Sequence, residues 1–185
     1  LYATSQEIYP HLGASSVLTP NVQWRFQSGA KVTFAHMFYE KEKYNWQGSQ
    51  IPLLMFDELV HFTESQFFYM FSRNRSTCGV RPYIRATCNP DGESWVARFI
   101  DWWIDPETGY ADESRCGKLR YFIRRNNIIH WADTPQQLYE EFHLYSPEEM
   151  EEVKSVSFIS AKLTDNAAMM KHDPGYIGAP VSYTH

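Results

Sequence analysis

The chain has 185 residues, of which 43% are hydrophobic, and it carries a formal net charge of −5 at pH 7. This length fits one globular domain, or one domain with a small appendage, and the apolar content is ample for a core. No apolar run approaches the roughly 20 residues that span a bilayer, so we expect no membrane partner. Because the sequence begins at Leu1 and has no signal-peptide pattern, we expect a fragment or a trimmed chain.

Three cysteines, Cys78, Cys88 and Cys116, show neither C-x-x-C spacing nor a neighbouring histidine at ligand spacing. This pattern argues against a zinc site and favours a reducing compartment, in which the three residues are plain thiols.

The charged residues are unevenly distributed. One basic cluster lies within thirteen residues that contain no acid, and it consists of Arg73, Arg75, Arg81 and Arg85. A second consists of Lys118, Arg120, Arg124 and Arg125, after which residues 126–153 hold seven acids and no Lys or Arg. Such segregation can direct a basic face at phosphates, although a solvated surface with ordinary ion pairs explains the second cluster at least equally well.

The first fifty residues predict short elements. A helical turn is expected around residues 6–9, and a loop is expected over residues 13–20. Residues 22–26 and 31–37 alternate apolar and polar side chains on either side of a Ser28-Gly29 turn, which predicts a β-hairpin.

Residues 52–59, Pro-Leu-Leu-Met-Phe-Asp-Glu-Leu, place two adjacent carboxylates after an apolar run. Such a run predicts a strand covered by helices on both faces. Ligands of open α/β sheets bind outside the carboxyl ends of the strands, and the pattern resembles a Walker B motif. Asp57 would then hold Mg²⁺, and Glu58 would polarise a water against a γ-phosphate. The alternative is a core strand that runs into a helix cap.

A helix and a second strand are predicted next. Thr63 and Gln66 have the spacing of a capping box, which predicts a helix that ends near Arg75. Residues 83–88 predict a strand that stops at Asn89 because proline follows. If the two strands are parallel neighbours, Asn89 lies beside Glu58, where its amide can sense the γ-phosphate or orient a water.

Arg73 and Arg75 lie on or just after the predicted helix. They are candidates for a charge-stabilising arginine that acts in cis or on a neighbouring subunit. A pair of surface arginines without a phosphate partner is an equal alternative, because guanidinium groups are common on exposed helix ends.

The second half of the chain predicts a smaller α+β body. A helix is expected over residues 94–104, a β-hairpin over 119–125 and 128–131, and a strand over 156–161. Thr134-Pro135 and Ser146-Pro147 each begin a capping-box pattern with proline at the first helical position, and residues 173–176 start a final turn or short helix. The change in composition near residue 105 predicts a boundary, with an α/β core at 1–105 and a subdomain at 106–185.

Five short motifs follow one another along nearly the whole chain. They are Trp-Gln-Gly at 46–48, Leu-Met-Phe-Asp-Glu-Leu at 54–59, Phe-Ser-Arg-Asn-Arg-Ser at 71–76, Ala-Thr-Cys-Asn-Pro at 86–90, and Ala-Lys-Leu-Thr-Asp-Asn at 161–166 with Asp-Pro-Gly-Tyr at 173–176. Their order and spacing resemble the large terminase subunit of tailed bacteriophages, in the second part of its packaging ATPase.

The resemblance implies a fold and a set of roles. It implies an α/β fold, namely a partial P-loop NTPase core of the RecA/ASCE type with a mainly parallel sheet, followed by a small α+β lid over the nucleotide. By resemblance Asp57 is the metal-associated acid and Glu58 is the catalytic base. Thr87, Cys88 and Asn89 match the motif that couples hydrolysis to movement, so Thr87 and Asn89 are expected to contact the nucleotide.

The resemblance also implies a biological setting. In this family, ATP hydrolysis with Mg²⁺ drives double-stranded DNA into an empty capsid, and a separate nuclease domain cuts the DNA. The implied partners are double-stranded DNA, the portal protein, the small terminase subunit and other copies in a ring. The implied location is the cytoplasm of the bacterial host. For DNA contact the candidates are Arg120, Arg124 and Arg125.

The chain departs from the family pattern in its phosphate-binding loop. No G-x-x-x-x-G-K-[ST] occurs, and Ser28-Gly29-Ala30-Lys31 lacks the first glycine and the final Ser or Thr. In the family that loop lies upstream of Leu1. Because its backbone N–H groups supply most phosphate binding, we expect the chain alone to hydrolyse ATP negligibly and to leave an open sheet edge beside the strand that ends at Asn89. Some relatives also carry an arginine just before the glycine that precedes the Walker B strand. Here Gln47 occupies that position, before Gly48.

Two other functions remain open. One is a metal-dependent nuclease that uses Asp57 and Glu58, with Asp91 as a candidate third ligand, as a two-metal carboxylate site. The other is a non-catalytic module that binds DNA or a partner ring through its basic clusters.

Overall fold

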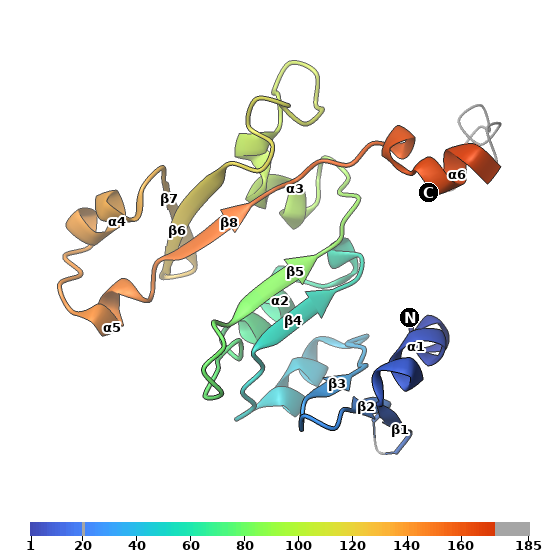
Figure 1. Ribbon diagram of the computed structural model, residues 1–185. Helices are drawn as coiled ribbons and strands as arrows, with labels where there is room; N and C mark the ends of the chain where they lie inside the picture. Colours follow the sequence, from blue (N-terminus) through green and yellow to red (C-terminus); the bar gives the residue numbers. More distant parts are fainter. Residues whose placement is uncertain (20, 173–185) are drawn as a thin grey trace. The chain divides into compact units, whose positions relative to one another are not determined.

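The computed structural model describes residues 1–19 and 21–172, and the chain divides into two units, Leu1–Val96 and Ala97–His185 (Figure 1). The boundary predicted near residue 105 falls within the second unit. The turn or helix predicted at 173–176 lies outside the described residues.

The first unit contains two small sheets and the helices around them, where η denotes a 3₁₀ helix. In chain order its elements are α1 (Tyr2–Ile8), η1 (Tyr9–Leu12), β1 (Ser15–Val17), β2 (Gln23–Arg25), β3 (Lys31–Thr33), η2 (Glu40–Trp46), β4 (Leu53–Phe56), η3 (Leu59–His61), α2 (Glu64–Phe71), β5 (Tyr83–Ala86) and the start of α3 (Trp95–Phe99).

The amino-terminal sheet has the order β1-β2-β3 and is antiparallel throughout. The predicted hairpin is confirmed, with Trp24 opposite Val32. Strand β1 was expected to be loop, since its Ser-Ser-Val sequence has no alternation to reveal it. Trp24 is buried, its indole N–H donates to Ser5 Oγ at 2.9 Å, and the ring of Tyr9 meets it edge-on. These contacts hold α1 and η1 against the sheet.

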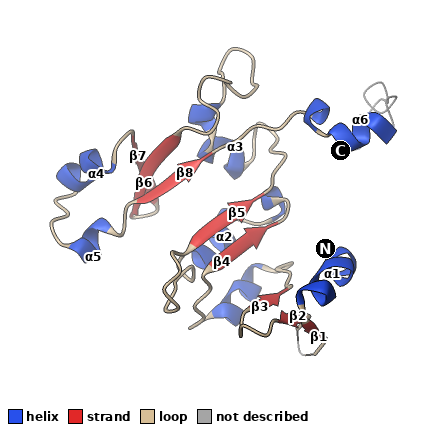
Figure 2. Ribbon diagram, in the orientation of Figure 1, coloured by secondary structure: helices blue, strands red, loops and turns tan. Residues whose placement is uncertain are grey.

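The second sheet is the parallel pair β4–β5, which confirms the predicted neighbours. Figure 2 shows α2 against one face of this pair. Leu54 and Phe56 are buried on that side, where the ring of Phe56 lies 5.4 Å from that of Phe67. Leu53 and Met55 point the other way and are 40% and 73% exposed. The prediction of a strand covered on both faces is therefore wrong within the first unit, because α2 covers one face and no described element of that unit covers the other.

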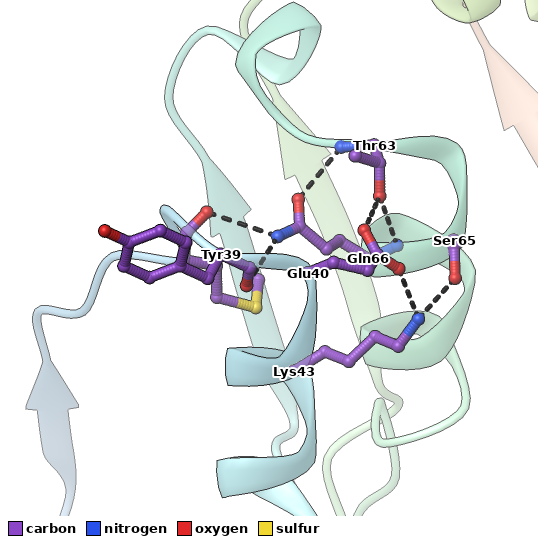
Figure 3. A network of polar contacts seen from close by, with 7 residues as sticks. Tyr39, Glu40, Lys43, Thr63, Ser65 and Gln66 are labelled. Atoms are coloured by element: carbon purple, nitrogen blue, oxygen red, sulfur yellow. Dashed lines mark hydrogen bonds and ion pairs between the residues drawn. The ribbon is translucent and has the colours of Figure 1, made fainter.

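A polar network fastens η2 to the start of α2 (Figure 3). The capping box of Thr63 and Gln66 is present as predicted. The buried Gln66 amide also donates to the carbonyls of Met37 and Tyr39, both at 3.2 Å. Lys43, also buried, donates to Glu40 and to Ser65, and Thr63 donates to the other oxygen of Glu40 at 2.6 Å. The segment before β4 is thus tied to the helix after it.

The second unit is a three-stranded antiparallel sheet with short helices. Its described elements are the end of α3, η4 (Asp101–Trp103), β6 (Leu119–Arg125), β7 (Ile128–Ala132), α4 (Pro135–Glu141), α5 (Pro147–Met150), β8 (Lys154–Ser157), η5 (Leu163–Asp165) and α6 (Ala167–His172). The order is β7-β6-β8. Leu138 of α4 is fully buried against Ile123 and Ala132 of the hairpin.

Some of the elements predicted for the second unit are confirmed and others are not. The hairpin is confirmed, and Asn126 and Asn127 take the positive φ angles that a two-residue turn requires. The capping boxes at Thr134 and Ser146 are also confirmed. The single helix predicted over 94–104 is wrong, because α3 ends at Phe99 and a separate 3₁₀ turn follows. The last strand is shifted to Lys154–Ser157.

The fold is mixed α/β. The expected mainly parallel sheet is not found within residues 1–19 and 21–172, because parallel pairing there is limited to β4–β5 and the other two sheets are antiparallel. The connections explain the difference: β2–β3 and β6–β7 are joined by tight turns, which permit only antiparallel pairing, whereas α2 lies between β4 and β5.

Candidate functional site

The acid pair lies where β4 ends, next to the end of β5. The register pairs Phe56 with Ala86, so Asp57 and Thr87 are the next residues on the two strands. The Thr87 hydroxyl donates to Asp57 Oδ1 at 3.1 Å and accepts the backbone N–H of Glu58 at 3.0 Å. The Thr87 carbonyl accepts the N–H of Leu59 at 2.8 Å. Thr87, which directly follows β5, therefore binds the three consecutive residues that follow β4.

Glu58 has a left-handed backbone, with φ at 53° and ψ at 69°. A residue with a Cβ disfavours this region by roughly 1–2 kcal/mol, and such residues concentrate at functional sites. The turn directs the chain into η3, and the carboxylates of Asp57 and Glu58 both stay exposed. The site thus presents two acids to solvent at the carboxyl edge of a parallel pair.

His61 is a neighbour that the sequence analysis does not single out. Its Nε2 lies 3.4 Å from Glu58 Oε2, and both side chains are mostly exposed. Glu58 caps η3 and His61 is the last residue of that turn, so a spacing of three residues brings the two side chains together. This spacing is the only sequence signal for the contact. A protonated His61 forms an ion pair with Glu58 and holds its carboxylate in place.

Among the described residues, no hydrogen bond or ion pair joins Asn89 or Asp91 to the acid pair. Asn89 follows Thr87 by two positions, is exposed, and forms no hydrogen bond with described residues. Asp91 organises its own turn, because its Oδ1 accepts the Glu93 N–H at 3.0 Å. Among residues 1–19 and 21–172, no group of three or more His, Cys, Asp or Glu side chains could hold a metal ion.

Arg73 and Arg75 lie at the opposite end of the β4–β5 pair from the acids. The Arg73 carbonyl accepts the N–H of Ile51 at 3.0 Å, and the Asn74 amide donates to the carbonyls of Ile51, Pro52 and Tyr83 at 2.8–3.2 Å. In Figure 1 the loop after α2 reaches the tails of both strand arrows. Asp57 and Glu58 directly follow Phe56, the last residue of β4. From Pro52 to Asp57 is about 16 Å of extended chain. The structure does not bring these arginines to the acid pair of the same copy.

The arginines of the β6 hairpin are engaged within the second unit. Arg120 lies 3.0 Å from Asp133, donates to the Ala132 carbonyl at 3.3 Å, and covers the ring of Trp102 with its guanidinium group. Its side chain is only 12% exposed. Arg125 forms an ion pair with Glu152, and Arg124 faces Ile129 across the hairpin.

The three cysteines are free thiols. Burial raises the pKa of Cys88, which directly follows Thr87, and the Ser76 hydroxyl lowers the pKa of the exposed Cys78. Within the described part of the chain, no helix is both long and apolar enough to cross a bilayer.

Comparison with known proteins gives one match. Residues 6–179 match the family described as "Terminase large subunit, T4likevirus-type, N-terminal". Searches of curated proteins and of solved structures found no match. The family match covers almost the whole chain, so the chain belongs to the T4-like terminase large subunits and corresponds to their N-terminal region.

Proposed function

We propose that this chain is part of a motor ATPase that drives double-stranded DNA into a prohead, with Asp57 and Glu58 at its hydrolytic site. The observation that carries the proposal is the Thr87 hydroxyl, which bonds both to the Asp57 carboxylate and to the backbone of Glu58. The family membership supplies the setting of phage DNA packaging.

The acid pair suits the two tasks that the proposal assigns to it. One oxygen of Asp57 accepts from Thr87, and the other has no partner among the described residues. Mg²⁺ is commonly held by one or two carboxylates together with substrate phosphates and waters. A single available carboxylate therefore suits Mg²⁺ better than it suits a metal ion whose ligands all come from the protein. When bound, the ion would neutralise charge on the phosphates. Asp57 is its proposed ligand.

Glu58 is the proposed base. Its left-handed backbone turns the side chain out of the strand line, and its carboxylate is exposed to solvent, where an attacking water can reach it. Thr87 and His61 act on Glu58 from its backbone and its carboxylate respectively, so we assign them positioning roles. Asn89 stays a proposed sensor of the terminal phosphate.

A P-loop NTPase core remains part of the proposal. Support comes from the parallel pair β4–β5 and from its exposed apolar face. Parallel sheets in cores of this class are apolar on both faces, because helices cover both. The proposed nucleotide is ATP with Mg²⁺. The unit after Val96, with its antiparallel sheet, is the proposed lid. The portal protein, the small terminase subunit and further copies in a ring are the proposed partners, in the cytoplasm of a bacterial host.

The nuclease alternative has less support. It requires a cluster of carboxylates around Asp57 and Glu58, whereas Asp91 is committed to the turn that follows Pro90. For the stretches described here, no three-residue metal-binding group exists. Cutting of plasmid DNA by the purified chain with Mg²⁺ or Mn²⁺ would reverse this preference.

The test uses a version of the protein extended upstream to include a phosphate-binding loop. We expect Glu58→Ala and Glu58→Gln to lower the ATPase rate about 10²- to 10⁴-fold, the usual contribution of a general base. Glu7→Ala is the matched control, because Glu7 is exposed and its side chain forms no hydrogen bond or ion pair among the described residues. The proposal fails if the extended wild type hydrolyses ATP no faster than the Glu58 variants.

A further inference from the structure

The loop between α2 and β5 carries the most concentrated unpaired charge in the first unit. From Ser65 to Pro90 the chain has four arginines and no Asp or Glu. We call Arg73, Arg75 and Arg81 of this loop, together with Arg85 of β5, the arginine loop. Within residues 1–19 and 21–172, none of the four forms an ion pair, whereas Arg115, Arg120 and Arg125 each do.

The contacts of the arginine loop leave its cationic groups available. The Nε atoms of Arg73 and Arg75 donate to the hydroxyl and the carbonyl of Ser72 at 3.1 and 3.0 Å. Arg73 covers the ring of Tyr69, and Arg85 covers that of Tyr83, which is itself 45% exposed. Arg75, Arg81 and Arg85 are exposed. The aromatic contacts orient two guanidinium groups without neutralising them.

The backbone of the loop is fixed at its base. The Asn74 amide donates to three carbonyls at the beginnings of β4 and β5, and Arg73 accepts from Ile51. Gly79, with φ at 78°, provides the turn between Arg75 and Arg81. Arg73, Arg75 and Arg81 therefore project from an anchored loop at one end of the sheet, and the guanidinium group of Arg85, within β5, lies over Tyr83 at the beginning of that strand. That end is opposite to Asp57 and Glu58, so an anion bound there is distinct from a phosphate hydrolysed at the acid pair of the same copy.

We infer that the arginine loop is a docking surface for the phosphate backbone of a nucleic acid. Guanidinium groups bind phosphate oxygens through paired N–H donors, and several unpaired arginines on one surface suit a repeating anion. The assignment rests on the proposed function in taking double-stranded DNA as the polymer.

An acidic surface on a second copy is the competing partner. The acid-rich stretch of this chain suits that role poorly, because four of its seven carboxylates are already engaged. Asp133 pairs with Arg120, Glu152 with Arg125 and Glu141 with His130, and Glu149 accepts the N–H groups of Tyr145 and Ser146.

The test measures binding of a short fluorescent DNA duplex to the chain without nucleotide. The triple variant Arg75→Gln, Arg81→Gln, Arg85→Gln should bind about 10- to 100-fold more weakly at ~0.1 M salt, and the slope of log affinity against log salt should fall by about 2 to 3. The control changes Lys31, Lys41 and Lys171 to Gln, because these lysines are exposed, lie outside both basic clusters and give the same change in net charge. It should lose less than about threefold.

Each outcome decides the inference. Equal losses in the arginine variant and the lysine control overturn it, because the attraction then comes from net charge alone. Dissociation of an oligomer in sedimentation, with unchanged DNA affinity, overturns it in favour of a second copy. If the triple variant does not fold, Arg81→Gln alone decides, and its salt slope should fall by about 1.

The result is separable from that for the ATPase. Glu58→Ala should keep wild-type affinity for DNA, since Glu58 lies at the other end of the sheet. Loss of DNA binding in the arginine variant together with full ATPase activity in Glu58→Ala would refute only the proposed hydrolytic role. The reverse combination would refute only the arginine loop.

Discussion

At the scale of single residues, Glu58 combines a proposed chemical role with an unfavourable backbone. Its positive φ costs roughly 1–2 kcal/mol for any residue with a Cβ, and the hydrogen bond from its N–H to Thr87 helps to maintain that conformation. Apolar patterning can indicate where an acid pair ends a strand. It cannot indicate the sign of φ at the second acid, because that angle depends on a hydrogen bond to Thr87, which is 29 residues away in the sequence.

This conformation leads to a prediction about stability. We expect Glu58→Gly to raise the free energy of unfolding by about 1 kcal/mol, because glycine removes the left-handed strain. The greater conformational entropy of glycine in the unfolded chain offsets only part of this stabilisation. Glu58→Ala removes the same carboxylate but keeps a Cβ, so its stability should stay near that of the wild type. Urea unfolding of the three proteins provides the measurement, and an equal stability of the Gly and Ala variants would show that the turn is unstrained.

At the scale of elements, the network between η2 and α2 contains the carboxylate with the largest change in acidity. Hydrogen bonds from the Lys43 ammonium group, and then from the Thr63 and Ser65 hydroxyls, lower the pKa of Glu40 from 4.5 to about 2. A carboxyl with a lower pKa in the folded state than in the unfolded state stabilises the fold at pH above the unfolded value. That stabilisation is lost as the pH falls from about 4.5 through 2.

The matching prediction is a change in acid sensitivity. Between pH 5 and 3 the urea midpoint of the wild type should fall more steeply than that of Glu40→Gln, which cannot release or take up this proton. Glu7→Gln should follow the wild type, because the exposed Glu7 side chain forms no hydrogen bond or ion pair among the described residues. Parallel curves for wild type and Glu40→Gln would mean that the network does not couple to folding.

Elements defined by local chemistry were predictable, and those defined by distant contacts were not. Capping boxes at Thr63, Thr134 and Ser146 and the Asn-Asn hairpin turn use residues three positions apart or fewer, so the sequence contains the whole signal. Strand β1 exists because β2 pairs with it, and the break after Phe99 occurs within an uninterrupted aromatic pattern. The separation of Arg73 and Arg75 from the acids likewise depends on Asn74 and its contacts at the starts of both strands.

At the scale of the whole molecule, the chain exposes an apolar sheet face. Leu53, Met55 and Tyr83 are 40%, 73% and 45% exposed, and they share one face of the β4–β5 pair with Arg85. In the part of the chain that the structure describes, neither outer edge of this pair has a further strand. Two-stranded sheets are marginal on their own, and open edges with apolar faces attract other chains. The face therefore creates a tendency to associate.

We expect the chain to associate reversibly at high concentration and Met55→Lys to reduce that association. A lysine at this position keeps the strand exposed but places a charge where apolar contact would form, which opposes pairing of either the face or the edge. Ile128→Lys is the matched control, because Ile128 is also on a strand and is 60% exposed but belongs to the other sheet. Sedimentation velocity at several concentrations measures the effect. If Met55→Lys and Ile128→Lys shift the association equally, general solubility explains the change, and the β4–β5 face has no special part in it.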